Sequence, residues 1–147
     1  MVVVFGLLFW WRMGRLEGIL FPVLGILSLL ADAFKMAINQ PRPSASLVQI
    51  LTTETSKGFP SSHAFFSVLM LGLTAYLLFT HLQVRWQKIL SLVVIIMLAL
   101  FVGTSRVYLG VHWTSEVIGG WVIGGLVLTG VIWVYSIIKG KEGKVKF

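Results

Sequence analysis

Four apolar stretches, each about as long as a membrane's hydrocarbon core is thick, dominate this sequence. They cover residues 16–34, 63–82, 89–105 and 116–138. A bilayer core of about 30 Å needs roughly 20 apolar residues in a helix, and each stretch comes close to that length. The sequence therefore predicts an all-α protein, a polytopic transmembrane helix bundle that forms one membrane-embedded domain over residues 1–147.

Composition supports this fold class and excludes an ordinary soluble domain. Hydrophobic residues make up 57% of the chain and charged residues 12%, where soluble globular proteins average about 25% charged residues. The net charge of +7 would suggest nucleic acid in a soluble protein. Here it favours membrane topology and an anionic substrate instead, and we predict no nucleic-acid partner. The absence of cysteine excludes disulfides and thiolate ligands.

The amino-terminal residues 1–11 are apolar but too short to cross a bilayer as a helix, since they would rise only about 16 Å. We predict a partial helix here, the end of a transmembrane helix whose start is missing; an interfacial anchor is the alternative. Residues 35–62 are polar, and Pro41, Pro43 and Pro60 interrupt any continuous helix through them. We expect this segment to be a loop on one face of the membrane.

Positive charges are distributed unevenly between the two predicted faces. Eight of the twelve basic residues fall on one face: Arg12, Arg15, Arg85, Lys88, Lys139, Lys141, Lys144 and Lys146. By the positive-inside rule this face is cytoplasmic. The other four, Lys35, Arg42, Lys57 and Arg106, fall on the opposite face, where topology does not explain them. We therefore expect an integral protein of the plasma membrane, with a functional site on its outer face.

Three short motifs meet at this predicted outer face. They are Lys35-x6-Arg42-Pro43, Pro60-Ser61-Ser62-His63 and Ser105-Arg106-x5-His112-x3-Glu116. The first follows one apolar stretch, the second precedes the next, and the third joins the last two. The predicted topology therefore brings cations, hydroxyls, two imidazoles and a carboxylate to one edge of the bundle.

This set of side chains suits the chemistry of a phosphate group. Arginine and lysine bind an anion with several oxygens, and the free backbone N–H groups at a helix start favour such an anion. Two histidines can act in phosphoryl transfer, one as nucleophile and one as acid. Glu116 lies four residues after His112, so that it can orient the imidazole if this segment is helical.

The order and internal spacing of the three motifs resemble the signature of the type 2 phosphatidic acid phosphatase family of membrane lipid phosphatases. The resemblance implies that His112 attacks phosphorus, that His63 protonates the leaving oxygen, and that Glu116 orients His112. The phosphoryl oxygens would be held by Lys35, Arg42, Ser61, Ser62 and Arg106. The resemblance also implies that the reaction needs no metal and no cofactor, and the chain has no carboxylate cluster that suits magnesium.

The chain departs from the family pattern at three points. Serine stands at position 62, where glycine is usual, and would be strained if the residue needed a positive φ. Glutamate stands at position 116, where aspartate is usual, and its extra methylene threatens the position of the imidazole. Membrane members of the family typically have six helices, so the pattern predicts a six-helix core truncated at its amino end.

We therefore expect a phosphatase acting on a lipid phosphomonoester or diphosphate, such as phosphatidate, phosphatidylglycerol phosphate or undecaprenyl diphosphate. Two alternatives remain open: a catalytically weakened relative that binds phospholipid, and a small transport or assembly subunit. Gly120 and Gly124 favour helix packing within the chain over a dimer contact. Asp32 is expected either to pair with a basic residue of the site or to serve a structural role.

Overall fold

The computed structural model describes residues 2–52 and 54–144, with the side chains of those up to Gly140. The described residues form helices joined by turns and one long loop, as the sequence predicts. The helices are α1 (Val2–Arg12), α2 (Arg15–Leu27), α3 (Leu30–Ile38), α4 (Ser62–His81), α5 (Arg85–Tyr108) and α6 (Thr114–Lys144).

Within the described residues, four segments are long and apolar enough to cross a membrane, and α2 and α3 together make up the first of them. They are Arg15–Ile38, Ser62–His81, Arg85–Tyr108 and Thr114–Gly140. The polytopic helical bundle expected from the sequence is therefore confirmed. Asn39 ends α3 in a left-handed conformation (φ 53°) just before Pro41, which cannot continue a helix.

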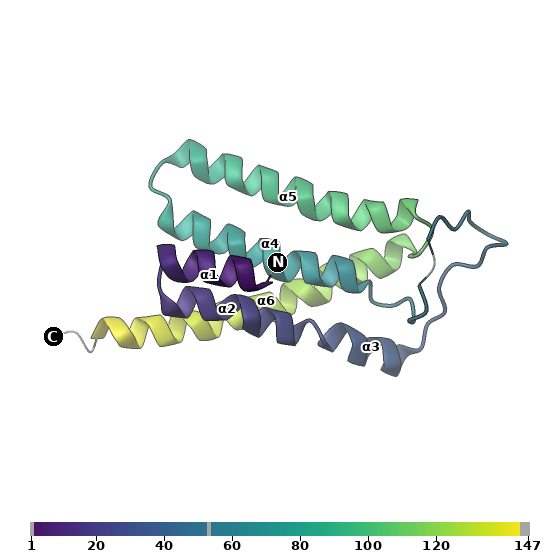
Figure 1. Ribbon diagram of the computed structural model, residues 1–147, viewed down its shortest axis with the longest axis horizontal. Helices are drawn as coiled ribbons and strands as arrows, with labels where there is room; N and C mark the ends of the chain where they lie inside the picture. Colours follow the sequence, from purple (N-terminus) through teal and green to yellow (C-terminus); the bar gives the residue numbers. More distant parts are fainter. Residues whose placement is uncertain (1, 53, 145–147) are drawn as a thin grey trace.

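Helix α4 is the centre of the bundle, and α6 and α5 pack against it most extensively. Its buried face includes Phe65, Leu69, Leu73 and Leu77, each fully inaccessible. The short α1 packs against α2 as a helical hairpin (Figure 1). Many large apolar side chains of α5, by contrast, remain exposed on the outside of the bundle, as expected for a surface that faces lipid.

Gly120 and Gly124 let α6 approach α4 closely. A Cβ atom at Gly120 would lie 2.7 Å from the carbonyl oxygen of Ser61, and one at Gly124 would lie 2.9 Å from that of Phe65. The two glycines therefore serve packing within the chain, as the sequence indicated. This close approach places the start of α4 beside the start of α6.

The two ends of the bundle differ in character. One end of the bundle, on the right of Figure 1, carries the long loop, and it also holds α3, the start of α4, the end of α5 and the start of α6. The opposite end holds the α1–α2 and α4–α5 turns and the carboxyl-terminal part of α6. All three predicted motifs lie at the first end, called here the loop end.

Candidate active site

His112 and Glu116 form the most deeply buried polar pair at the loop end. The Nδ1 atom of His112 lies 2.7 Å from Oε2 of Glu116, and the two side chains are 1% and 0% exposed. Glu116 is the third residue of α6, and its Oε2 also accepts the backbone N–H of Trp113 just before the helix, at 3.2 Å. This contact is the glutamate half of a capping box. The hydrogen bond that caps the start of α6 thus also holds the Glu116 carboxylate beside the His112 imidazole.

The other oxygen of Glu116 is held as well, because Nε2 of Gln40 donates to Oε1 at 3.2 Å. Three donors from two parts of the chain therefore fix this carboxylate. The extra methylene that distinguishes glutamate from aspartate does not separate it from the imidazole, as the 2.7 Å contact shows.

Arg42 determines which ring nitrogen of His112 carries the proton. Its Nη1 lies 3.2 Å from Nε2 of His112, and a guanidinium can only donate. Nε2 must therefore be the acceptor, and Nδ1 must carry the hydrogen that points to Glu116. The lone pair that a nucleophilic histidine needs lies on the side of the cations.

The loop before α4 holds Arg42 in place. Glu54 pairs with Nη2 at 2.6 Å, while Ser56 accepts from Nε through its carbonyl at 2.6 Å and from Nη2 through its hydroxyl at 2.9 Å. Nη1 also donates to the carbonyl of Val111 at 2.7 Å. The guanidinium thus bridges the loop and the segment that carries His112.

Lys35 comes from α3 and reaches the same loop. It is 4% exposed, and its Nζ donates to the carbonyl of Lys57 at 2.8 Å and to the Ser56 hydroxyl at 3.2 Å. Ser56 is therefore shared between Lys35 and Arg42, which places two cations around one hydroxyl. Lys57 contributes its backbone here and not its charge.

The start of α4 supplies two serines with different surroundings. Ser61 is fully buried, and its hydroxyl has no hydrogen-bond partner among the residues that the structure describes. Ser62 is the first helical residue, and it is not among the residues with positive φ. The strain considered for serine at this position is therefore absent.

His63 is exposed and borders two cavities. One, of about 240 Å³, is also lined by Ser62 and Asp32; the other, of about 480 Å³, is almost entirely apolar and extends between α4 and α5. Asp32 thus faces the cavity beside His63. The surroundings of His63 include four charged or titratable residues, namely Arg106, Glu54, His112 and Lys35.

Arg106 lies on the last turn of α5, where its Nε donates to the Ser105 hydroxyl at 3.3 Å. It is one of the charged groups in the surroundings of His63. The structure therefore brings the eight residues expected from the motifs to the loop end. Among the residues that it describes, no three His, Asp or Glu side chains gather as they would around a metal ion.

Four residues of this site were missed in the sequence, namely Gln40, Glu54, Ser56 and Gly58. The first three contact predicted site residues directly, as described above. Gly58 matters through its missing side chain, since a Cβ atom there would lie 2.2 Å from Oε1 of Glu116. All four lie in the polar segment 35–62, whose path the sequence pattern does not reveal.

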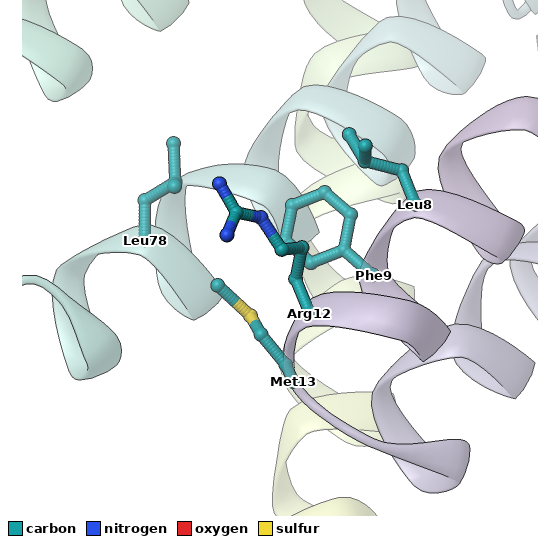
Figure 2. Close-up of a pocket in the computed structure, with 5 residues that line it drawn as sticks. All are labelled: Leu8, Phe9, Arg12, Met13 and Leu78. Atoms are coloured by element: carbon teal, nitrogen blue, oxygen red, sulfur yellow. The ribbon is translucent and has the colours of Figure 1, made fainter.

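A separate cavity of about 260 Å³ lies far from the motifs, between α1 and the end of α4. Figure 2 shows its lining, in which the Arg12 guanidinium stands among the apolar side chains of Leu8, Phe9, Met13 and Leu78. Among the described residues that line it, Arg12 is the one polar side chain, so this cavity does not show the combination of groups found at the loop end.

Comparison with known proteins agrees with the helix pattern and the motifs. A solved structure, described as "Crystal structure of the first transmembrane PAP2 type phosphatidylglycerolphosphate phosphatase from Bacillus subtilis", superposes with a TM-score of 0.76 at 32% identity. The match covers 99% of this chain and 68% of that chain. With its four candidate spans, the chain is an integral membrane protein.

Curated relatives carry related names. Phosphatidylglycerophosphatase B of Bacillus subtilis (strain 168) is 34% identical over 84% of this chain and 57% of the relative. Undecaprenyl-diphosphatase of Sulfolobus acidocaldarius is 32% identical over 65% of this chain and 44% of the relative. The chain thus spans about half the length of these relatives.

A model of one family covers most of the chain. It is described as the PAP2 superfamily, and it matches residues 17–139, which include all three motifs. By this match, and by its likeness to the Bacillus subtilis structure and relative, the chain belongs to the PAP2 superfamily, the family of type 2 phosphatidic acid phosphatases.

Proposed function

We propose that this protein is a lipid phosphate phosphatase that works through a phosphohistidine on His112. The observation that carries the proposal is the arrangement of Glu116, His112 and Arg42. It leaves Nε2 of His112 unprotonated and directed toward cations.

The first step forms a bond between Nε2 of His112 and phosphorus and breaks the bond from phosphorus to the ester oxygen. His63 donates a proton to the departing oxygen, which leaves as the alcohol of the lipid, or as the lipid monophosphate if the substrate is a diphosphate. The proton on Nδ1 of His112 stays on the imidazole and is held by Glu116, which stabilises the charge that develops on the ring.

In the second step a water molecule attacks phosphorus while His63 accepts its proton. The bond between Nε2 and phosphorus breaks, and orthophosphate leaves. Lys35, Arg42 and Arg106 hold the phosphoryl oxygens throughout, since the transition state spreads negative charge over them. Ser61 adds its buried hydroxyl, which has no partner in the described structure, and Ser62 adds the first backbone N–H of α4.

The apolar cavity beside His63 supports a lipid substrate. At about 480 Å³ it lies within the size range of small-molecule sites, and its lining by α4 and α5 suits a hydrocarbon chain that enters from the bilayer. The relatives' names favour a phosphatidylglycerol phosphate or an isoprenoid diphosphate. We place the site on the outer face of the plasma membrane, because most basic residues lie toward the other end.

Phosphate release by the purified protein tests this function. We expect release from at least one of phosphatidate, phosphatidylglycerol phosphate and undecaprenyl diphosphate, resistance to EDTA, and inhibition by vanadate. His112→Ala should lower kcat by about 10⁴-fold or more. His81→Ala is the matched control, because His81 lies at the carboxyl end of α4, away from the motifs.

The two alternatives give different results in the same assay. A weakened relative would bind lipid phosphates and release no phosphate from any of them. A transport or assembly subunit would show the same low release in wild type and in His112→Ala. Release that His112→Ala leaves unchanged would refute the nucleophile assignment.

A further inference from the structure

Every N–H group of the Arg42 guanidinium has an acceptor within the protein. A guanidinium has five such groups. Nε meets the Ser56 carbonyl, Nη1 meets the Val111 carbonyl and Nε2 of His112, and Nη2 meets the Ser56 hydroxyl and the Glu54 carboxylate. A phosphoryl oxygen can therefore bind Arg42 only by replacing one of these acceptors.

The five acceptors differ in how easily they can leave. Two are backbone carbonyls, and their positions follow the path of the chain. His112 is 2% exposed and held by Glu116. The Ser56 hydroxyl also serves Lys35. Glu54, by contrast, has a side chain that is 26% exposed, so it can turn toward solvent.

Glu54 is also the acceptor most similar to phosphate. A carboxylate and a phosphoryl group both offer charged oxygens to the guanidinium fork. The Glu54 carboxylate lies 2.6 Å from Nη2, and this nitrogen also donates to the Ser56 hydroxyl that Lys35 contacts. It therefore occupies a place in the cation cluster where an anion of the substrate is expected.

We propose that Glu54 is a built-in competitor of phosphate at Arg42, which weakens the binding of substrate and speeds the release of orthophosphate. The part of this inference that concerns substrate and product during turnover rests on the proposed function. When a phosphoryl group binds, the Glu54 carboxylate leaves Nη2, and Nη1 is free to turn from Nε2 of His112 to the phosphoryl oxygens. After hydrolysis the carboxylate returns to Arg42 and takes the place of the product.

The experiment measures orthophosphate binding by calorimetry on the full chain in detergent, with wild type, Glu54→Gln, Glu54→Ala and Glu54→Asp. Loss of the competing charge should lower the Kd for orthophosphate about threefold to tenfold in the first two variants, as expected for a partly exposed ion pair. Glu54→Asp keeps the charge and should stay within about twofold of wild type. The Ki of orthophosphate and the KM for lipid phosphate should fall by the same factor in Glu54→Gln.

Glu142→Gln is the control for net charge. It also removes one negative charge, and position 142 lies near the carboxyl end of α6, far along that helix from Glu116. We expect its Kd for orthophosphate to equal that of wild type. Thermal unfolding of each variant identifies any that do not fold.

The opposite result has a clear structural meaning. If Glu54 only positions Arg42, both Glu54→Gln and Glu54→Ala will bind orthophosphate more weakly than wild type. If the Kd for orthophosphate is unchanged or raised in these two folded variants, the proposal that Glu54 competes with phosphate is overturned. The proposed function fails separately, through absence of phosphate release by wild type, and the calorimetric result stands in either case.

Discussion

Helix α6 carries a buried carboxylate contact near each of its ends, and the two differ in what they leave available. Near its start, Glu116 accepts from His112, Trp113 and Gln40. Near its other end, Tyr135 donates to Glu17 of α2 at 2.7 Å, and Lys139 donates to both Glu17 and the Tyr135 hydroxyl. The Glu17 cluster joins a carboxylate of α2 to two residues four apart on α6, whereas the Glu116 cluster joins a carboxylate of α6 to His112, which lies just before that helix.

The cluster of Glu17 is closed on itself, since its donors and acceptors serve one another and join α2 to α6. The cluster of Glu116 is open, because Nε2 of His112 presents its lone pair to Arg42 and the Ser61 hydroxyl stays unpaired among the described residues. Burial of a charged group is thus a weak sign of function. A reactive nitrogen that faces a cation, together with an unpaired buried hydroxyl, is a much stronger sign.

The largest difference between the two clusters is expected from removal of their carboxylates. Glu116→Gln keeps the shape of the side chain but removes the charge that holds the His112 tautomer, so kcat for phosphate release should fall about 10³- to 10⁴-fold. Glu116→Asp keeps the charge and should lose about 10- to 100-fold through misplacement. Glu17→Gln is the matched control, with kcat within about threefold of wild type. If kcat fell equally in Glu116→Gln and Glu17→Gln, the distinction between an open catalytic cluster and a closed structural cluster would be contradicted.

A glycine provides a second test of the open cluster without touching its polar groups. Gly58→Ala introduces a Cβ atom that would lie 2.2 Å from Oε1 of Glu116, so the carboxylate or the loop must move. We expect kcat/KM to fall about 10- to 100-fold, because catalysis is sensitive to displacements near 1 Å.

Gly125→Ala is the control for Gly58→Ala, since a Cβ atom at Gly125 meets no atom of the described residues within 4 Å. It should keep wild-type kcat/KM. If the two alanine variants have the same activity, Gly58 does not control the position of Glu116.

The sequence predicts the membrane helices well because lipid selects for long apolar stretches. The differences lie at helix ends and within the predicted helix 16–34, which is divided into α2 (Arg15–Leu27) and α3 (Leu30–Ile38). Helix α5 begins at Arg85 and α6 reaches Lys144, beyond the apolar stretches at 89–105 and 116–138, because polar residues at a membrane surface can remain helical. The sequence predicts a partial helix over residues 1–11, and α1 covers Val2–Arg12.

The site residues that could be predicted from the sequence are those whose charge or titratable group is unusual in a membrane protein. Lys35, Arg42, His63, Arg106 and His112 are charged or titratable groups at helix ends of a membrane protein, where such groups are costly and therefore informative. Gly58 and Glu54 carry no comparable signal, since glycine and glutamate are ordinary in polar loops. Their roles depend on how the loop between α3 and α4, residues 39–61, folds back over the cations. The predicted loop 35–62 was slightly too long, because α3 continues to Ile38, and no periodic pattern encodes the path of the loop.

The closed cluster is expected to affect stability more than activity. Glu17→Ala leaves the buried Tyr135 hydroxyl without its acceptor, which costs about 1–3 kcal/mol of unfolding free energy. Tyr135→Phe removes only a hydroxyl, and should cost about 1 kcal/mol. Thermal unfolding in detergent should show a midpoint lowered by several degrees in Glu17→Ala, with kcat within about threefold of wild type.

Ser136→Ala serves as the control for the closed cluster, since Ser136 is exposed and its hydroxyl only contacts the Trp133 carbonyl one turn earlier. Its unfolding midpoint should match that of wild type. A midpoint in Glu17→Ala as high as that of Ser136→Ala would show that Glu17 does not join α2 to α6.

The smallest effect is expected at Ser62, where the chain departs from the glycine usual in its family. Ser62 is the first residue of α4 and has no positive φ, so glycine relieves no strain there and costs at most about 1 kcal/mol of helix stability. Ser62→Gly should therefore change kcat/KM by less than about threefold. Ser61→Ala removes a buried hydroxyl that is free to bind phosphate, and should lower kcat/KM about tenfold. A larger loss in Ser62→Gly than in Ser61→Ala would mean that the partly exposed serine, and not the buried one, contacts the substrate, because backbone strain cannot account for it.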